Sequence, residues 1–221
     1  MPGKLIAIEG IDGSGKGTQA KLLRDRFLAA GATAALLSFP RYAETRFGGY
    51  VGEYLNGRFG SLDEVHPFLA SLLFAGDRFE SREVIRDALE RHDVVVCDRY
   101  VASNVAHQAA KCDGAARQEL IRRIEEVEFE VYRLPRPDRT VLLDLSVENA
   151  RRLIALKAKR SYTDRTEDLH ESDGIYLGAV GDVYRARQAS DPTWVRIACE
   201  RDGVVRPIEA IHADVWDAVR A

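Results

Sequence analysis

The feature that most constrains this chain is a glycine-rich run between an apolar segment and a helix-like one. Residues 10–18 read GIDGSGKGT, the apolar run KLIAIE precedes them, and the helical pattern KLLRDRFLAA follows at 21–30. Glycines let successive backbone N–H groups curl around phosphate oxygens, while a helix N-terminus and a lysine supply positive charge. Strand, loop, lysine and helix in this order predict a phosphate-binding loop rather than an ordinary glycine-rich turn.

The loop departs from its strict form at one position. That form has Ser or Thr directly after the lysine, whereas here Gly17 follows Lys16 and Thr18 comes next. Because one residue rotates a helical side chain by about 100°, we do not expect Thr18 to ligate Mg²⁺ directly. A metal ion at this loop is expected to depend on waters, phosphates and a nearby carboxylate.

Short apolar runs alternate with helix-length segments along the chain. The runs are residues 4–9, 33–39, 93–97, 140–145 and 193–198, and the helical stretches include 16–30, 62–91, 115–132, 147–157 and 168–189. Continuous apolar runs are typical of strands buried on both faces of a parallel sheet. The order therefore predicts an α/β fold with helices on both faces of a parallel sheet.

Two segments do not fit this alternation. Residues 40–60 are rich in Gly, Tyr and Arg, and residues 157–167 (KAKRSYTDRTE) are polar and basic and end before Asp168, a typical helix-capping residue. Both are expected to leave the sheet edge as loops, where ligands are usually bound. Because there is no internal repeat and no low-complexity linker, we expect residues 1–221 to form one domain.

The composition narrows the setting and the partners. A net charge of −3 and a pI of about 6.0 give no reason to expect nucleic acid or a membrane surface as a partner. The N-terminal apolar run is too short for a signal peptide or a membrane span. Cys97, Cys112 and Cys199 lie far apart without metal-ligand spacing. We therefore expect a cytoplasmic protein with reduced cysteines and no zinc site.

A second candidate element follows the third apolar run, where the chain reads Asp98-Arg99-Tyr100. A carboxylate at the carboxyl end of a buried strand is well placed to bind Mg²⁺ or its waters. The adjacent arginine can hold a phosphate through two parallel hydrogen bonds. Alone, such a triplet is more often a salt-bridged turn, but beside a phosphate loop it indicates a second phosphate contact.

Together these motifs resemble those of the thymidylate kinases over nearly the whole chain. The motifs, in order, are IEGIDGSGKGTQ at 8–19, FPRY at 39–42, LLFAGDRFE at 72–80, DRYVASNVAHQ at 98–108, LPRPD at 134–138 and the basic segment before residue 168. Other nucleoside monophosphate kinases share the loop and the sheet. The pair LLFAxDR and DRYxxSN is far more specific to the thymidylate branch.

The resemblance implies a three-layer P-loop NTPase fold with a five-stranded parallel sheet and a small lid. It places the P-loop at 10–18, the acceptor-binding region at about 39–108 and the lid at about 157–168. It further implies Mg²⁺-dependent transfer of the γ-phosphoryl of ATP to dTMP, in dTTP biosynthesis, by a homodimer. The residues expected around ATP are Gly10, Asp12, Gly13, Ser14, Gly15, Lys16, Gly17 and Thr18.

The same resemblance assigns roles in the acceptor site. Phe74 is expected to stack on thymine, Arg78 to donate to its O4, and Asn104 to read its N3 edge. Without the resemblance, Phe74 would be interpreted as core packing and Arg78 as part of a surface ion pair. The full expected acceptor set is Asp12, Phe39, Arg41, Tyr42, Phe74, Arg78, Arg99, Ser103, Asn104, His107, Asp168 and Glu171.

One acceptor position differs from related bacterial enzymes, which carry a Tyr where this chain has His107. That Tyr crowds the 2′ carbon and favours deoxyribose, so the substitution leaves sugar discrimination open. Tyr42, Arg99 and Arg41 are the candidates for holding the acceptor phosphate, and Asp12 is expected to touch the sugar 3′-OH or the metal.

The catalytic cations are expected to come from the loop and the lid. In one branch of the family an Arg inside the phosphate loop acts on the transferred group, but here Gly13 and Ser14 occupy those positions. The lid carries Lys157, Lys159, Arg160 and Arg165, of which we favour Arg160; a solvated basic loop is the alternative. The expected catalytic set is Lys16, Arg99, Arg160 and Asp12, and the expected Mg²⁺ ligands are Asp12, Asp98 and Glu171, partly through water.

Two other functions fit part of these features. A kinase of the same fold could use dUMP, CMP, AMP or a deoxynucleoside as its acceptor. An ATP-hydrolysing switch module would share the phosphate loop, but it has no use for a second base pocket around Phe74, Arg78 and Asn104.

Overall fold

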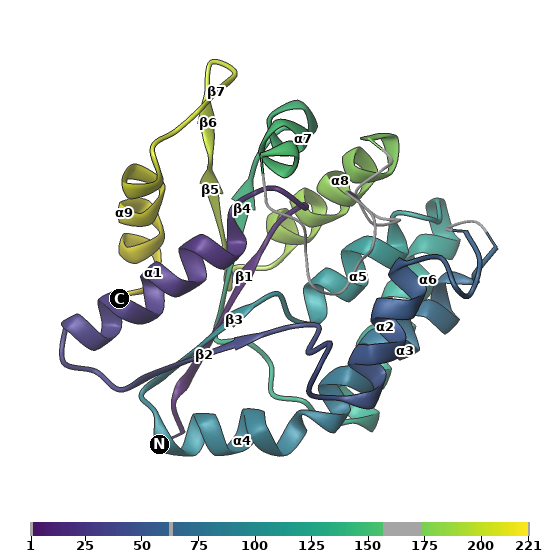
Figure 1. The fold of residues 1–221 in the computed structure, drawn as a ribbon, viewed down its shortest axis with the longest axis horizontal. Coiled ribbons are helices and arrows are strands. Elements are labelled where there is room, and N and C mark those ends of the chain that lie inside the picture. Colours follow the sequence, from purple (N-terminus) through teal and green to yellow (C-terminus); the bar gives the residue numbers. More distant parts are fainter. Residues whose placement is uncertain (1, 62–63, 157–173, 221) are drawn as a thin grey trace.

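The computed structural model describes residues 2–61, 64–156 and 174–220 (Figure 1). Five strands form one parallel sheet in the order β2-β3-β1-β4-β5. Their bounds are β1 Lys4–Glu9, β2 Ala34–Ser38, β3 Val94–Asp98, β4 Arg139–Asp144 and β5 Trp194–Ala198. The five apolar runs of the sequence therefore form the predicted α/β sheet.

Burial follows the position of each strand in the sheet. The three inner strands β1, β3 and β4 are almost entirely buried, whereas the edge strands β2 and β5 are partly exposed. The inner strands contain uninterrupted apolar segments, such as VVVC in β3 and VLL in β4, because both of their faces are covered.

Helices cover both faces of the sheet (Figure 1). On one face α1 (Lys16–Ala29) packs on β2 and β3, and α9 (Ile208–Val219) packs on β4 and β5. On the other face α4 (Arg82–Arg91) contacts β3, while α8 (Gly174–Ser190) contacts β4, β5 and α5 (Val101–Ala109). Next to α8 lies α7 (Val147–Ala155).

Two helices beyond the carboxyl ends of β2 and β3, α2 (Arg46–Leu55) and α3 (Pro67–Glu80), form a separate small core. Beside α3 and α5 lies α6 (Gly114–Glu125), whose buried residues belong to the main core and which continues into a π-helical segment, η1 (Glu126–Val131). The buried residues of this small core are Val51, Tyr54, Leu55 and Ala70. The group joins the sheet through α5, which α3 contacts directly.

Several local expectations differ from the structure. The predicted helix 62–91 is two helices, because α3 begins with Pro67 and ends at Glu80, where the hydroxyl of the C-cap residue Ser81 donates a hydrogen bond to the carbonyl of Asp77. Segment 40–60 was expected to be a loop but contains α2, capped by Thr45, whose side chain accepts from the amide of Gly48. The predicted helix 115–132 changes to π-helical geometry at Glu126.

The sequence pattern also gave no signal for the small antiparallel hairpin β6 (Glu200–Arg201) and β7 (Val204–Val205). Two-residue strands are too short for a periodicity to register. Within the described ranges, none of the helices combines the length and apolar character that a bilayer span requires.

The buried sheet predicts a clear difference between two apolar truncations. Leu143→Ala in β4 removes a completely buried side chain and is expected to lower the free energy of unfolding by about 2–5 kcal/mol. The control Val204→Ala, at a side chain that is 69% exposed, should change it by less than about 0.5 kcal/mol. Urea denaturation of both variants measures the two values, and similar losses would contradict the assigned core.

Candidate active site

The phosphate loop joins β1 to α1 and uses glycine where other residues cannot fit. Gly13 has a φ of 86°, and a Cβ there would lie 2.3 Å from the carbonyl oxygen of Ala150. At Gly10, with a φ of 145°, a Cβ would lie 2.6 Å from the carbonyl oxygen of Leu143. The loop is thus pressed against β4 and α7 by close backbone contacts that only glycine allows.

A cavity of about 190 Å³ opens above this loop. Its walls are the loop and the end of β3, namely Asp12, Gly13, Gly15, Lys16, Gly17, Asp98 and Arg99. The cavity lies at the carboxyl ends of parallel strands and at the N-terminus of α1, where backbone N–H groups and the helix dipole favour an anion.

Lys16 is buried at the bottom of this cavity and folds back over the loop. Its Nζ donates to the carbonyl oxygens of Gly10 at 2.9 Å and Ile11 at 2.7 Å. Burial first, and then the positive charge of Arg99, lower the pKa of Lys16 from its ordinary 10.5 to about 7, although the nearby carboxylates oppose this shift. The ammonium therefore gains from any anion that enters the cavity.

Gly17 makes room for a carboxylate. A Cβ at Gly17 would lie 2.9 Å from Oδ2 of Asp98, so a larger residue here would displace that side chain. Thr18 is exposed and lines a different cavity from Lys16. The departure from the strict motif thus places Asp98, rather than a hydroxyl group, beside the first turn of α1.

Arg99 connects the loop to the helix α5. Its backbone has a φ of 66°, a conformation unusual for a residue other than glycine. Its guanidinium forms an ion pair with Asp12 of the loop and lies 3.5 Å from the hydroxyl of Ser103. The side chain is about one-fifth exposed and faces the phosphate cavity. One cation therefore lies between the loop and the first turn of α5.

The completely buried carboxylate of Glu9 fixes this arrangement. Its Oε1 accepts from the amides of Tyr100 at 2.7 Å and Ser103 at 3.3 Å, and its Oε2 accepts from the hydroxyls of Ser103 at 2.6 Å and Tyr184 at 3.0 Å. Burial raises the pKa of Glu9, while these hydrogen bonds oppose the rise. Sequence reasoning missed Glu9; its one signal was an acidic residue ending an apolar strand.

A second region holds the predicted base-binding residues on α3 and α5. Phe74 is half-buried against the small helical core, with its ring centroid 6.2 Å from that of Tyr54 in an edge-to-face arrangement. Arg78 and Asn104 are both buried. Asn104 donates through Nδ2 to the carbonyl oxygen of Ser71 at 3.0 Å, which joins α5 to α3. The structure thus brings Phe74, Arg78 and Asn104 into one region.

Arg78 is not on the surface, where its alternative interpretation placed it. Its guanidinium pairs with Glu128 of the π-helical segment through two hydrogen bonds, one from Nε to Oε2 at 2.9 Å and one from Nη2 to Oε1. The side chains are 2% and 0% exposed, so the pair is almost completely removed from water. Sequence reasoning missed Glu128, because nothing in a helical pattern marks one glutamate among several as buried.

His107, which the sequence analysis placed near the acceptor sugar, is buried beside Tyr176. Its Nδ1 lies 3.2 Å from the hydroxyl of Tyr176, which itself donates to the carbonyl oxygen of His107 at 2.8 Å. Its Nε2 lies 4.0 Å from Oδ2 of Asp12. Burial lowers the pKa of His107 to about 3, so the imidazole is neutral at physiological pH. His107 therefore adds no positive charge to this region.

The other predicted acceptor residues differ in their surroundings. Phe39 is buried in the main core, and Tyr42 packs against the small helical core. Arg41 donates from its backbone amide to Asp77 and from its guanidinium to the hydroxyl of Ser81. Phe39 is thus placed for packing, whereas Arg41 and Tyr42 are partly exposed.

Comparisons with known proteins agree with these motifs. A family model described as "Thymidylate kinase" matches residues 8–184. The chain is 36% identical over 200 residues to the thymidylate kinase of Mycobacterium tuberculosis (strain ATCC 25618 / H37Rv), covering 90% of this chain and 92% of that protein. It is 36% identical over 222 residues to the probable thymidylate kinase of Pyrococcus abyssi, covering 100% and 97%.

A solved structure of thymidylate kinase from Candida albicans matches with a TM-score of 0.74 and 25% sequence identity, covering 99% of this chain and 92% of that one. The chain belongs to the thymidylate kinase family. The predicted fold class and family are therefore confirmed by independent comparisons of sequence and structure.

Several predicted residues lie outside the described ranges of this family member. They are the lid residues Lys157, Lys159, Arg160 and Arg165, together with Asp168 and Glu171. Their roles remain predictions from the sequence.

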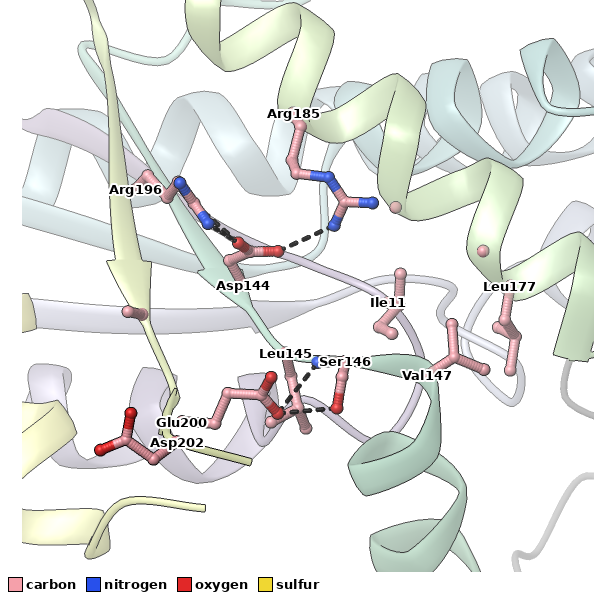
Figure 2. A pocket seen from close by; sticks show the side chains of 13 residues that line it. Ile11, Asp144, Leu145, Ser146, Val147, Leu177, Arg185, Arg196, Glu200 and Asp202 are labelled. Atoms are coloured by element: carbon pink, nitrogen blue, oxygen red, sulfur yellow. Dashed lines mark hydrogen bonds and ion pairs between the residues drawn. The ribbon is translucent and has the colours of Figure 1, made fainter. Parts of the chain in front are cut away.

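A further cavity near the phosphate loop offers a contrast with the Lys16 cavity. It has a volume of about 500 Å³ and includes Ile11 of the loop in its wall. Figure 2 shows Arg185 and Arg196 on either side of Asp144, at 3.1 Å and 2.7 Å from its carboxylate oxygens. Both guanidinium groups are held by this one carboxylate, whereas the glycine loop and the N-terminus of α1 lie at the smaller cavity. Backbone N–H groups and a helix dipole favour an anion, so the smaller cavity is the better candidate for a phosphate site.

The donor set at the phosphate cavity fits a magnesium ion. Asp12 and Asp98 both line it, and Mg²⁺ in kinases is usually held by one or two carboxylates together with waters and phosphates. Among the described residues no group of three or more His, Cys, Asp or Glu forms a metal cage. A carboxylate pair facing a phosphate site is compatible with Mg²⁺ brought in with a nucleotide.

The depressed pKa of Lys16 predicts proton uptake on ATP binding. A triphosphate favours the charged ammonium, so the pKa of Lys16 should rise in the complex, and the neutral fraction present above about pH 7 must take up a proton. ATP affinity should therefore fall as the pH rises from about 7 to 9. At about pH 8 the nucleotide phosphates are already ionised.

Calorimetric titration at about pH 8, in two buffers with different ionisation enthalpies, measures this uptake. The difference in apparent binding heat, divided by the difference in buffer ionisation enthalpy, gives the number of protons taken up. We expect this number to approach one per site. At about pH 6, where Lys16 is already charged, its contribution should be small. Identical heats in both buffers at pH 8 would contradict a near-neutral pKa for Lys16.

Proposed function

We propose that this chain is a thymidylate kinase that transfers the γ-phosphoryl of ATP to dTMP, producing dTDP and ADP. The observation that carries the proposal is the position of Arg99. Its guanidinium pairs with Asp12 of the phosphate loop, and the helix that follows it carries Asn104 of the predicted base site. A cation shared between a donor site and an acceptor site is what in-line phosphoryl transfer requires.

The donor nucleotide is assigned to the loop and to an apolar cavity beside it. The loop amides and Lys16 would hold the phosphates. A neighbouring cavity of about 270 Å³ between α1, α7 and α9 would hold the base, and its wall includes Thr18, Leu153, Leu156 and Arg206. Apolar walls with few polar groups are typical of sites that bind an aromatic ring.

The acceptor is assigned to the region between α2, α3 and α5. Phe74 would stack on thymine, while Arg78 and Asn104 would contact its polar edge. Arg41, Tyr42 and Arg99 would hold its phosphate, with Ser103, His107 and Asp12 near the sugar. The half-buried state of Phe74 supports this assignment, because a stacking platform needs a face that is not covered by the core.

Charge neutralisation would provide most of the catalysis. Lys16 and Arg99 would stabilise the negative charge on the transferred group, and Asp12 keeps Arg99 in position between the two phosphates. Asp98 and Asp12, with Glu171, would hold Mg²⁺, which supplies further positive charge when bound. No general base is required, because the acceptor phosphate is already ionised near neutral pH.

We further infer that residues 1–221 act as one domain in a cytoplasmic homodimer. The large apolar side chains Tyr50, Leu69 and Phe79 of α2 and α3 are between 42% and 60% exposed, which supports an interface there. The three cysteines are free thiols, as expected in a reducing compartment.

An acceptor panel tests the function. Purified protein with Mg²⁺-ATP should release ADP rapidly with dTMP and more slowly with dUMP, CMP or AMP, and Lys16→Ala should lower kcat with dTMP by at least about a hundredfold. Circular dichroism should show Lys16→Ala to be folded. Rapid ATP hydrolysis without any acceptor, or full activity of Lys16→Ala, would contradict the proposal.

A second experiment locates the lid cation. Arg160→Ala should lower kcat by about a hundredfold with little change in the KM for dTMP, because a transition-state contact contributes little to ground-state binding. Arg165→Ala serves as the matched control and should leave kcat within about threefold. If Arg165→Ala instead produces the loss, the choice of Arg160 is wrong.

A further inference from the structure

A buried glutamate joins the two predicted readers of the acceptor base. Glu128 lies in η1, where the π-helical geometry is marked by the hydrogen bond from the amide of Tyr132 to the carbonyl oxygen of Val127 at 2.9 Å. Its side chain is completely buried, and its two oxygens contact Arg78 and Asn104.

The contacts of Asn104 fix which way its amide points. Its Nδ2 donates to the carbonyl oxygen of Ser71 at 3.0 Å and to Oε1 of Glu128 at 2.9 Å. Both partners are acceptors, so the group that faces them must be the NH₂. Both N–H bonds are then used, and only Oδ1 remains, which is buried without a hydrogen-bond partner among the described residues. A buried carbonyl left in this way calls for a donor.

Arg78 provides hydrogen-bond donors next to the acceptor oxygen of Asn104. A guanidinium has five N–H donors and no acceptor, and Glu128 uses two of them. The carboxylate partner raises the pKa of Arg78 despite its burial, so the group stays charged. With Glu128 bound to both side chains, the oxygen of Asn104 and the remaining N–H groups of Arg78 are still available to a ligand.

We propose that Glu128 is the positioning residue that sets the base selectivity of the acceptor site. Thymine and uracil present an N3–H donor and an O4 acceptor, which complement the Asn104 oxygen and the Arg78 donors. Cytosine presents an N3 acceptor and an amino donor. The Asn104 oxygen would then face another acceptor, and the Arg78 donors would face another donor. This inference rests on the proposed function, because it assumes that dTMP is the acceptor.

Glu128→Gln tests the proposal with a nearly isosteric change. Oε1 accepts from both Nη2 of Arg78 and Nδ2 of Asn104, whereas Oε2 accepts from Nε of Arg78. The Gln amide sets its NH₂ group against Nε of Arg78 in one orientation, and against Nη2 of Arg78 and Nδ2 of Asn104 in the other. Because an amide nitrogen cannot accept these hydrogen bonds, either orientation displaces at least one of the two side chains. We expect the KM for dTMP to rise at least tenfold. The ratio of kcat/KM for dTMP over dCMP should fall at least tenfold, while the KM for ATP changes less than twofold.

Two further variants separate positioning from general destabilisation. Glu126→Gln, at an exposed glutamate of the same π-helical turn, should leave the ratio of dTMP to dCMP unchanged. In an Asn104→Ala background, Glu128→Gln should have a much smaller effect on the ratio than it has alone, because its route to N3 is already removed. If Glu128→Gln does not fold, Glu128→Asp keeps the charge beside Arg78 and should lower the same ratio.

The outcomes distinguish this inference from the proposed function. A wild-type protein that does not phosphorylate dTMP would overturn the proposed function itself. A wild-type protein active on dTMP whose folded Glu128 variants keep the same dTMP to dCMP ratio would overturn the role of Glu128 alone. Equal wild-type rates with dTMP and dCMP would also overturn it.

Discussion

The buried carboxylate of Glu9 is the interaction on which the site depends. It stands at the end of β1, immediately before the phosphate loop, and receives hydrogen bonds from the first turn of α5 and from Tyr184 of α8. A carboxylate without water is costly unless its oxygens are fully hydrogen-bonded, so these partners must keep their places. Because the loop begins at the next residue and Arg99 precedes α5, this one buried group sets the distance between the phosphate loop and the first turn of α5.

A second buried carboxylate connects α3 and α5. Glu128 is as deeply buried as Glu9 and is satisfied by Arg78 and Asn104 rather than by backbone amides. Buried ion pairs add little stability compared with apolar packing, and their best-supported use is to specify one arrangement. Here that arrangement orients two polar side chains from different helices, α3 and α5, while Phe74 supplies the apolar face beside them.

Much of the fold could be predicted because the strands are buried on both faces. Short, β-branched apolar runs such as VVVC in β3 favour buried strands, and the glycine-lysine loop indicated where the first strand ends. The elements that were missed have a local reason. The glycines of α2 weaken its helical signal, and Ser81 ends α3 within a continuous helical pattern. The roles assigned to individual site residues remain predictions.

The sequence by itself determined the class of fold, the phosphate loop and the family, because these depend on local pattern and on motifs in a fixed order. Only the tertiary structure decided which charged residues are buried and with whom they pair. Glu9 meets Ser103 and Tyr184, and Arg78 meets Glu128, across 50 to 175 positions of chain. These pairings depend on how whole helices pack on the sheet. They cannot be predicted from the type of side chain or from its neighbours in the sequence.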